Sequence, residues 1–360
     1  MARDLEHPLF RRDEGPLAKF LLFGLWLLSF AFRAIVRRRR KAWRSKATRV
    51  AAKVVSVGGL TVGGAGKTPI AIHLARRLAA EGRSPAVLSR GWGRDRPGQN
   101  VVVSDGKAVL ADVRASGDEP MLVARSCPGV PVLVGPNRAA VAQIAIERFG
   151  ARTLVLDDGF QHLGLARDLD VVVLDASNPF GNGHLLPRGP LREPKEALAS
   201  AGLVWLSKVD QAAEREIARL EADVRRWTKA PIVKSGYRVV DVLDDTGASL
   251  GPRALVGKKV LMLAGLARPL SFAKTLEAMG ATVAAHRLLP DHGWPRPMDV
   301  DQAKLAVREM GLDAIALTEK DAVRLPDSAR RGPFAVVRVE VEVERVGDGE
   351  AELARVLQAL

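Results

Sequence analysis

Eight consecutive residues combine the types that bind nucleotide phosphates. They read Thr61-Val62-Gly63-Gly64-Ala65-Gly66-Lys67-Thr68. Glycine lets the backbone approach an anion so that several N–H groups can donate to it, and a lysine adds positive charge for the β- and γ-phosphates. A threonine directly after that lysine is a typical Mg²⁺ ligand. The segment therefore predicts a loop that holds a nucleoside triphosphate.

The flanking sequence predicts the strand and the helix that such a loop requires. Lys53 to Val57 is a mostly apolar run typical of a buried strand, and Ile70, Leu74 and Leu78 follow at helical spacing. A helix that begins at the loop directs the positive end of its dipole at the phosphates. The usual pattern begins with glycine where this chain has Thr61, so the match is partial. An ordinary glycine-rich turn is the alternative.

Two aspartates follow a second predicted strand. The apolar run Thr153 to Leu156 is followed by Asp157 and Asp158. Parallel strands end at one edge of their sheet, beside the phosphate loop, where a carboxylate can handle Mg²⁺. A turn with a helix-capping aspartate is the alternative. We expect one of the two to bind Mg²⁺, and the sequence does not distinguish them.

Two other loops carry groups suited to proton transfer. Asp118 and Glu119 precede Pro120, and acids at the start of a helix are already favourable for structural reasons. His292 lies in a Pro/Gly-containing loop, and histidine is the side chain most often used for proton transfer near neutral pH. A histidine in a surface turn is the alternative reading.

Composition restricts the class of protein. A chain of 360 residues can form two domains, and its single cysteine, Cys127, excludes a disulfide framework and a cysteine-based zinc site. The net charge is +14, but residues 1–50 hold thirteen Lys/Arg and four Asp/Glu, a net of +9 that leaves +5 for the other 310 residues. Because this basic region flanks a hydrophobic stretch, an anionic membrane surface is favoured over nucleic acid as the partner.

The hydrophobic stretch runs from Leu17 to Val36, about 30 Å as a helix, which is close to the thickness of a bilayer core. Lys19 and Arg33 leave only thirteen uncharged residues between them, so a membrane span and a helix lying in the membrane plane both stay open. A soluble hydrophobic helix is the third possibility. The basic run Arg37 to Lys41 argues against a cleaved signal peptide and marks the following chain as cytoplasmic.

Strand and helix patterns alternate along most of the chain, which predicts an α/β fold with a parallel sheet. Two extended runs, Ile232 to Val240 and Phe334 to Val343, bracket a second set of alternating elements and predict a hinge of two strands. The expected organisation is a membrane-association segment (1–48), a phosphate-loop domain (49–231), a smaller α/β domain with flanking hinge strands (232–345) and a C-terminal helix (346–360).

The order of motifs resembles the tetraacyldisaccharide 4'-kinase family of lipid A biosynthesis over nearly the whole chain, and that family's phosphate loop also lacks the first glycine. Besides the loop, the resemblance rests on Ser89-Arg90-Gly91, Gly117-Asp118-Glu119-Pro120, Leu156-Asp157-Asp158-Gly159-Phe160-Gln161-His162, Leu185-Leu186-Pro187 with Gly189-Pro190-Leu191-Arg192-Glu193-Pro194, Pro290-Asp291-His292 and Thr318-Glu319-Lys320-Asp321. The chain departs from the family pattern at Gly59, Trp92, Leu163, His184 and Arg188.

The resemblance implies a P-loop NTPase-like α/β/α domain joined by a β-strand hinge to a smaller α/β domain, with an N-terminal membrane-associated helix. It implies transfer of the ATP γ-phosphoryl group to the 4'-hydroxyl of a tetraacyldisaccharide 1-phosphate at the cytoplasmic face of the bacterial inner membrane. It implies no nucleic acid and no obligate protein partner.

The resemblance also implies a role for each of several residues. Lys67 and the loop 61–68 hold ATP, and Asp118 draws the proton from the sugar hydroxyl with His292 as its partner. The implied Mg²⁺ ligands are Thr68, Glu119, Asp157 and Asp158. The implied lipid contacts are Arg90, Gln161, His162 and Arg192.

Two other classes share part of these patterns. Membrane-associated partition ATPases have a similar loop, but their signature lysine position is Val62 here. GTP-driven switch proteins read guanine with a pattern that Ser207 to Asp210 matches except at its first residue. Both are weaker interpretations than the lipid kinase.

Overall fold

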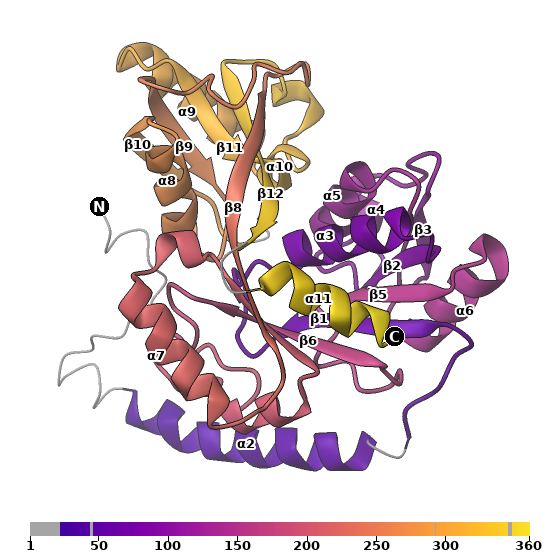
Figure 1. Cartoon of the computed structure of the whole chain (residues 1–360). Coiled ribbons are helices and arrows are strands. Elements are labelled where there is room, and N and C mark those ends of the chain that lie inside the picture. Colours follow the sequence, from indigo (N-terminus) through magenta and orange to yellow (C-terminus); the bar gives the residue numbers. More distant parts are fainter. Residues whose placement is uncertain (1–21, 44–45, 292, 345–347) are drawn as a thin grey trace.

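The computed structural model describes residues 22–43, 46–291, 293–344 and 348–360 and confirms the predicted α/β fold (Figure 1). The strands are β1 (Lys53–Gly59), β2 (Pro85–Ser89), β3 (Val101–Asp105), β4 (Pro131–Val134), β5 (Thr153–Asp157), β6 (Leu169–Asp175), β7 (Leu203–Ser207), β8 (Ile232–Leu243), β9 (Lys259–Ala264), β10 (Thr282–Leu288), β11 (Ala314–Thr318) and β12 (Phe334–Val343). The helices are α2 (Phe23–Trp43), α3 (Lys67–Ala80), α4 (Val113–Ser116), α5 (Asp118–Ser126), α6 (Arg138–Phe149), α7 (Glu214–Arg225), α8 (Pro269–Ala278), α9 (Pro297–Glu309), α10 (Glu319–Ala322) and α11 (Gly349–Gln358). All these strands join one sheet in the order β10-β9-β11-β12-β8-β7-β6-β1-β5-β2-β4-β3.

The first unit, residues 49–231, is a parallel sheet with β3 antiparallel at its edge. β5 and β7 are buried along their whole length, because α3 and α5 pack on one face of the sheet and α6 and α7 on the other. The carboxyl ends of β1, β5, β6 and β7 therefore meet at one edge, which is where the phosphate loop leaves β1.

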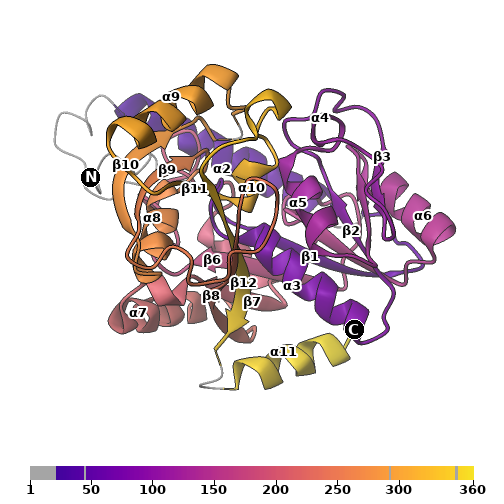
Figure 2. The ribbon, with the colours of Figure 1, turned by 90° about the horizontal axis from the view of Figure 1, so that it is seen from above.

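The second unit, residues 232–343, continues the same sheet. β8 begins parallel to β7 and then pairs antiparallel with β12 over most of its length. Beyond β12, the strands β11, β9 and β10 run parallel, with α8 on one face and α9 on the other. Figure 2 shows β8 and β12 between the two halves of the molecule. The two runs predicted to bracket this unit are thus sheet neighbours, while their action as a hinge and the domain boundaries stay predictions.

The helix α2 lies along the first unit, at the bottom of Figure 1. Ser29 is buried and its Oγ donates to the carbonyl of Leu185 at 2.9 Å, and Arg40 Nη1 lies 3.3 Å from Glu193 Oε2. Among the described residues, no helix combines the length and the apolar character needed to cross a membrane. The first part of the predicted hydrophobic stretch, residues 17–21, lies outside the described residues.

A buried ion cluster connects the strand ends with the second unit. Asp175 ends β6, and its Oδ2 lies 2.7 Å from Lys208 Nζ and also pairs with Arg268 of the second unit. Burial opposes ionisation of this carboxyl, but Lys208 and Arg268 outweigh burial and hold the pKa of Asp175 below its usual range. Lys208 Nζ also donates to the carbonyl of Gly64 at 2.6 Å, so the cluster fixes the phosphate loop as well.

We predict that Asp175→Asn lowers the free energy of unfolding by about 3 kcal/mol, because it leaves two buried cations without their anion. Asp327→Asn is the control, since the Asp327 side chain is 96% exposed; its effect should stay within about 0.5 kcal/mol. Urea titrations followed by circular dichroism measure both values. Equal effects of the two substitutions would contradict the structural role of the cluster.

Candidate active site

The glycines of the phosphate loop are required by backbone geometry and by space. Gly63, Gly64 and Gly66 have φ angles of 43°, 72° and 80°, in the left-handed region that favours glycine. A Cβ on Gly63 would lie 2.5 Å from that of Ala267, and one on Gly64 would lie 2.7 Å from Arg268 Cγ. The loop is therefore closely covered by the segment of the second unit that precedes α8.

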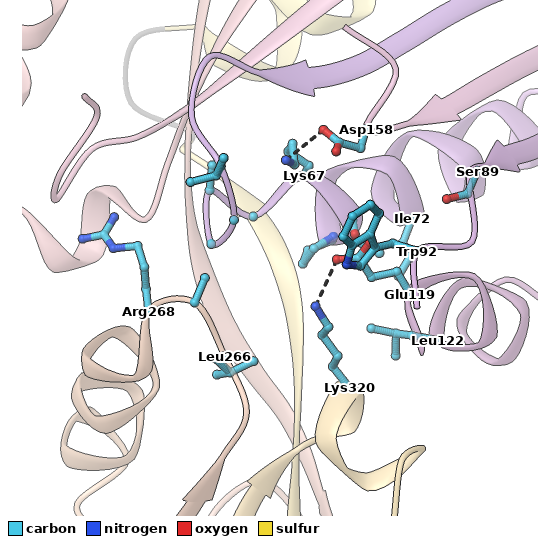
Figure 3. Close-up of a pocket in the computed structure, with 18 of the residues that line it drawn as sticks. Lys67, Ile72, Ser89, Trp92, Glu119, Leu122, Asp158, Leu266, Arg268 and Lys320 are labelled. Atoms are coloured by element: carbon cyan, nitrogen blue, oxygen red, sulfur yellow. Dashed lines mark hydrogen bonds and ion pairs between the residues drawn. The ribbon is translucent and has the colours of Figure 1, made fainter. Parts of the chain in front are cut away.

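A cavity of about 1670 Å³ lies between the two units. Val62 to Thr68 line it from the first unit together with Glu119, and Arg268 and Lys320 line it from the second unit (Figure 3). Thr61 is buried and forms a β-bridge with Leu191, so its predicted contact with nucleotide stays a prediction.

Lys67 and Arg192 both hold Asp158. Lys67 Nζ lies 2.8 Å from Asp158 Oδ1, and Arg192 donates to the two carboxylate oxygens at 2.7 and 2.9 Å (Figure 3 shows the lysine contact). Burial opposes ionisation, but Lys67 and Arg192 outweigh it and keep the pKa of Asp158 well below its usual range. Asp158 also has a φ of 52°, which is uncommon outside glycine and frequent at functional sites. Asp158 is thus an anion that orients the loop lysine.

Asp157 faces the loop threonine instead. Thr68 Oγ1 donates to Asp157 Oδ2 at 3.1 Å. Burial and the charges of Glu119 and Asp158 raise the pKa of Asp157 to about 7. The Asp157 carboxylate and the Thr68 hydroxyl beside it are hard oxygen ligands of the kind that Mg²⁺ takes.

No three His, Cys, Asp or Glu side chains in the described part of the chain are arranged to hold a metal by themselves. Nucleotide enzymes commonly bind Mg²⁺ with few protein ligands. Mg²⁺ there takes one or two carboxylates and completes its octahedron with water and phosphate oxygens.

The first turn of α5 faces the second unit. Asp118 is 4% exposed, and its Oδ1 accepts a hydrogen bond from the backbone N–H of Glu119 at 2.9 Å. Glu119 Oε1 lies 3.0 Å from Lys320 Nζ, the second contact drawn in Figure 3. The predicted partner of Asp118, His292, lies outside the described residues, so this pairing stays a prediction.

All four residues predicted to contact lipid line the same cavity, namely Arg90, Gln161, His162 and Arg192. Gln161 Nε2 donates to the carbonyl of Gly59 at 2.9 Å. Burial and the surrounding arginines lower the pKa of His162 to about 4, so this imidazole is neutral at physiological pH. Their contact with lipid stays a prediction, and Arg192 has the additional partner Asp158.

Sequence reasoning assigned no role to several side chains that shape the site. Lys208 belonged to a weak guanine-reading pattern, yet its ammonium donates to the carbonyl of Gly64. Lys320 lies in one of the motifs that carried the family resemblance, which was a usable signal. Arg268 and Arg324 had no local signal, because their partners are distant in sequence.

This chain is similar to known proteins over almost its whole length. The family profile described as tetraacyldisaccharide-1-P 4'-kinase matches residues 21–360. A tetraacyldisaccharide 4'-kinase of Anaeromyxobacter sp. (strain Fw109-5) is 51% identical over 350 residues, which cover 96% of this chain and 93% of the relative. One of Syntrophus aciditrophicus (strain SB) is 37% identical over 351 residues, which cover 94% and 93%.

A solved structure has the same fold. It is the "apo" form of LpxK from Aquifex aeolicus in complex with ATP, with a TM-score of 0.70 and 25% sequence identity, and the match covers 94% of this chain and 99% of that one. With a profile match over almost the whole chain and a relative that is 51% identical over 93% of its own length, the protein belongs to the tetraacyldisaccharide 4'-kinase family.

Proposed function

We propose that this protein transfers the γ-phosphoryl group of ATP to the 4'-hydroxyl of a tetraacyldisaccharide 1-phosphate, giving the 1,4'-bisphosphate in lipid A biosynthesis. The observation that carries the proposal is the cavity that the phosphate loop, Glu119 and Lys320 line together. The names of the relatives support the choice of substrate. The alternative of a partition ATPase is not favoured, since its signature lysine position is Val62.

The loop binds the nucleotide in this proposal. The backbone N–H groups of Gly63 to Gly66 and the ammonium of Lys67 bind the phosphates, and the N-terminus of α3 contributes its dipole. Lys208 keeps the loop in place from behind through the carbonyl of Gly64. Phosphoryl transfer needs in-line positioning and charge neutralisation more than covalent chemistry. The loop contributes to both, because it positions the phosphates and supplies positive charge.

Thr68, Asp157 and Glu119 are the residues that hold Mg²⁺ in this proposal. When bound, Mg²⁺ neutralises the charge that develops on the phosphate oxygens. Asp158 has a separate role, because Lys67 and Arg192 already satisfy its charge. It orients the lysine, while Asp157 and Thr68 face the metal.

Asp118 accepts the proton of the sugar hydroxyl, and His292 orients it. Asp118 stands at the start of α5, where the second unit covers it through α10. Covering this position excludes water, which competes with the sugar as phosphoryl acceptor.

The helix α2 attaches the protein to the cytoplasmic face of the inner membrane. Phe23, Leu27, Leu28 and Phe30 are each more than half exposed, and the basic run that follows them suits anionic headgroups. Phe32 and Ile35 of the same helix line the cavity. A lipid lying along α2 therefore reaches the phosphate loop without leaving the membrane surface, with Arg90, Gln161 and His162 on its path.

The lipid kinase activity is testable directly. Purified protein with ATP, Mg²⁺ and the disaccharide 1-phosphate in detergent should give a product one phosphate heavier, detected by mass spectrometry. ATP should turn over only when the lipid is present. Equal ATP turnover without lipid and no bisphosphorylated product would refute the proposed function.

The division of labour between the two aspartates predicts different Mg²⁺ responses. Asp157→Asn removes a metal ligand and should raise the Mg²⁺ concentration for half-maximal turnover about 10- to 100-fold. Asp158→Asn releases Lys67 and should lower kcat without moving that concentration. Titration of Mg²⁺ at saturating ATP separates the two, and the reverse pattern would show that Asp158 is the metal ligand.

The membrane role of α2 predicts an effect of charge on its exposed face. Leu27→Asp with Leu28→Asp should lower partition onto anionic vesicles at least about tenfold, because each leucine loses its apolar burial. Leu305→Asp with Met310→Asp is the matched control, since these residues are 52% and 53% exposed on the second unit. Co-sedimentation measures both, and an unchanged bound fraction of the α2 variant would show that another surface binds the membrane.

A further inference from the structure

Two cations of the second unit approach the proposed base from the same side. Lys320 Nζ and Arg324 Nε each lie 3.7 Å from Asp118 Oδ2, and Lys320 also contacts Glu119 at 3.0 Å. Both follow β11 in or directly after the short helix α10, whereas Asp118 begins α5 about two hundred residues earlier. Figure 3 shows the Lys320 side chain extending from the second unit to Glu119.

Arg324 is held in a fixed position. Its side chain is 1% exposed, its Nη2 donates to the carbonyl of Gly265 at 2.9 Å and pairs with Asp321, and its Nη1 donates to the carbonyl of Gly293 at 3.1 Å. Asp321 is itself bound by Thr318, whose hydroxyl donates to Oδ2 at 2.8 Å. A guanidinium keeps its charge even when buried. Because the group is planar and rigid, fixing its two terminal nitrogens also fixes the direction of the remaining N–H.

That remaining group, Nε, is directed at Asp118. It is buried and forms no hydrogen bond with any residue that the structure describes, which is an unfavourable arrangement for a donor unless its charge has a function. A separation of 3.7 Å is too long for a hydrogen bond but short for an interaction between charges. The two cations therefore attract Oδ2 without donating to it, while Oδ1 is fixed by the backbone N–H of Glu119.

We propose that Lys320 and Arg324 are positioning residues of the phosphoryl transfer. From the second unit they fix the direction of the Asp118 carboxylate, so that the base is aligned with the sugar hydroxyl only when the second unit covers α5. This inference rests on the proposed function, in which Asp118 accepts the hydroxyl proton. The competing explanation is that the two cations only hold the units together.

A double-mutant cycle separates these explanations. The variants are Lys320→Met, Arg324→Lys, Asp118→Asn and the combination of Lys320→Met with Asp118→Asn. For each, kcat, KM for ATP and the Mg²⁺ concentration for half-maximal turnover are measured, and binding of a fluorescent ATP analogue and thermal unfolding report on folding. Lys258→Met is the matched control, because Lys258 pairs with Asp313 at 3.1 Å on the exposed surface of the same unit.

We expect Lys320→Met to lower kcat about 100-fold, the effect of misplacing a reacting group by roughly 1 Å, with little change in KM for ATP. Arg324→Lys keeps the charge but loses the fixed geometry, so its kcat should lie between those of Lys320→Met and the wild type. In the Asp118→Asn background, Lys320→Met should lower kcat by a further factor of less than about two, since the two residues act as one unit. Lys258→Met should turn over normally.

Other outcomes overturn the inference. If Lys320→Met lowers kcat by the same factor with and without Asp118, the lysine does not act through the base. A shift in the Mg²⁺ concentration for half-maximal turnover would show that it acts through Glu119. Normal kcat in both Lys320→Met and Arg324→Lys, with Asp118→Asn impaired, would remove the inference and leave the proposed function intact. Normal kcat in Asp118→Asn would remove the proposed base and this inference together.

Discussion

The arrangement of the site follows from negative charge buried at the carboxyl edge of one parallel sheet. Asp157 ends β5 and Asp175 ends β6, both buried, and the partly exposed Asp158 follows Asp157 directly. Buried carboxylates need compensating cations, and the structure supplies them from separate parts of the chain. Lys67 and Arg192 pair with Asp158, and Lys208 and Arg268 pair with Asp175. Asp157 instead accepts a hydrogen bond from the Thr68 hydroxyl and has a raised pKa, and it is the carboxylate that we propose as the metal ligand.

The same requirement connects the two units. Arg268 reaches Asp175 from the segment before α8, and Lys320 reaches Glu119 from α10. These contacts close the cavity over the phosphate loop, so the position of the second unit depends on charges that belong to the site. In the proposed function, nucleotide binding, alignment of the base and exclusion of water are thereby coupled in one fold.

The features of this structure that depend on neighbouring residues could be predicted from the sequence. The loop, the strand before it, the helix after it and the two aspartates at the carboxyl end of β5 were predictable because each depends on residues close together in the chain. The cluster of Asp175, Lys208 and Arg268 was not, because its members are 33 and more residues apart and meet only through the strand order. Thr61 illustrates another limit, since a position within a motif does not reveal that the side chain is buried. The continuity of all strands in one sheet likewise depended on the pairing of β8 with β12, which no local pattern indicates.

The central claim is that the phosphate loop and the carboxylates beside it bind Mg²⁺ and ATP as one site. A crystal structure with a non-hydrolysable ATP analogue and Mg²⁺ tests it most directly. We expect Lys67 Nζ to contact the β- and γ-phosphates, Thr68 and Asp157 to face the metal, and Asp158 to keep its contact with Arg192. An analogue whose phosphates lie elsewhere in the cavity, or a metal bound by Asp158 without Asp157, would contradict it.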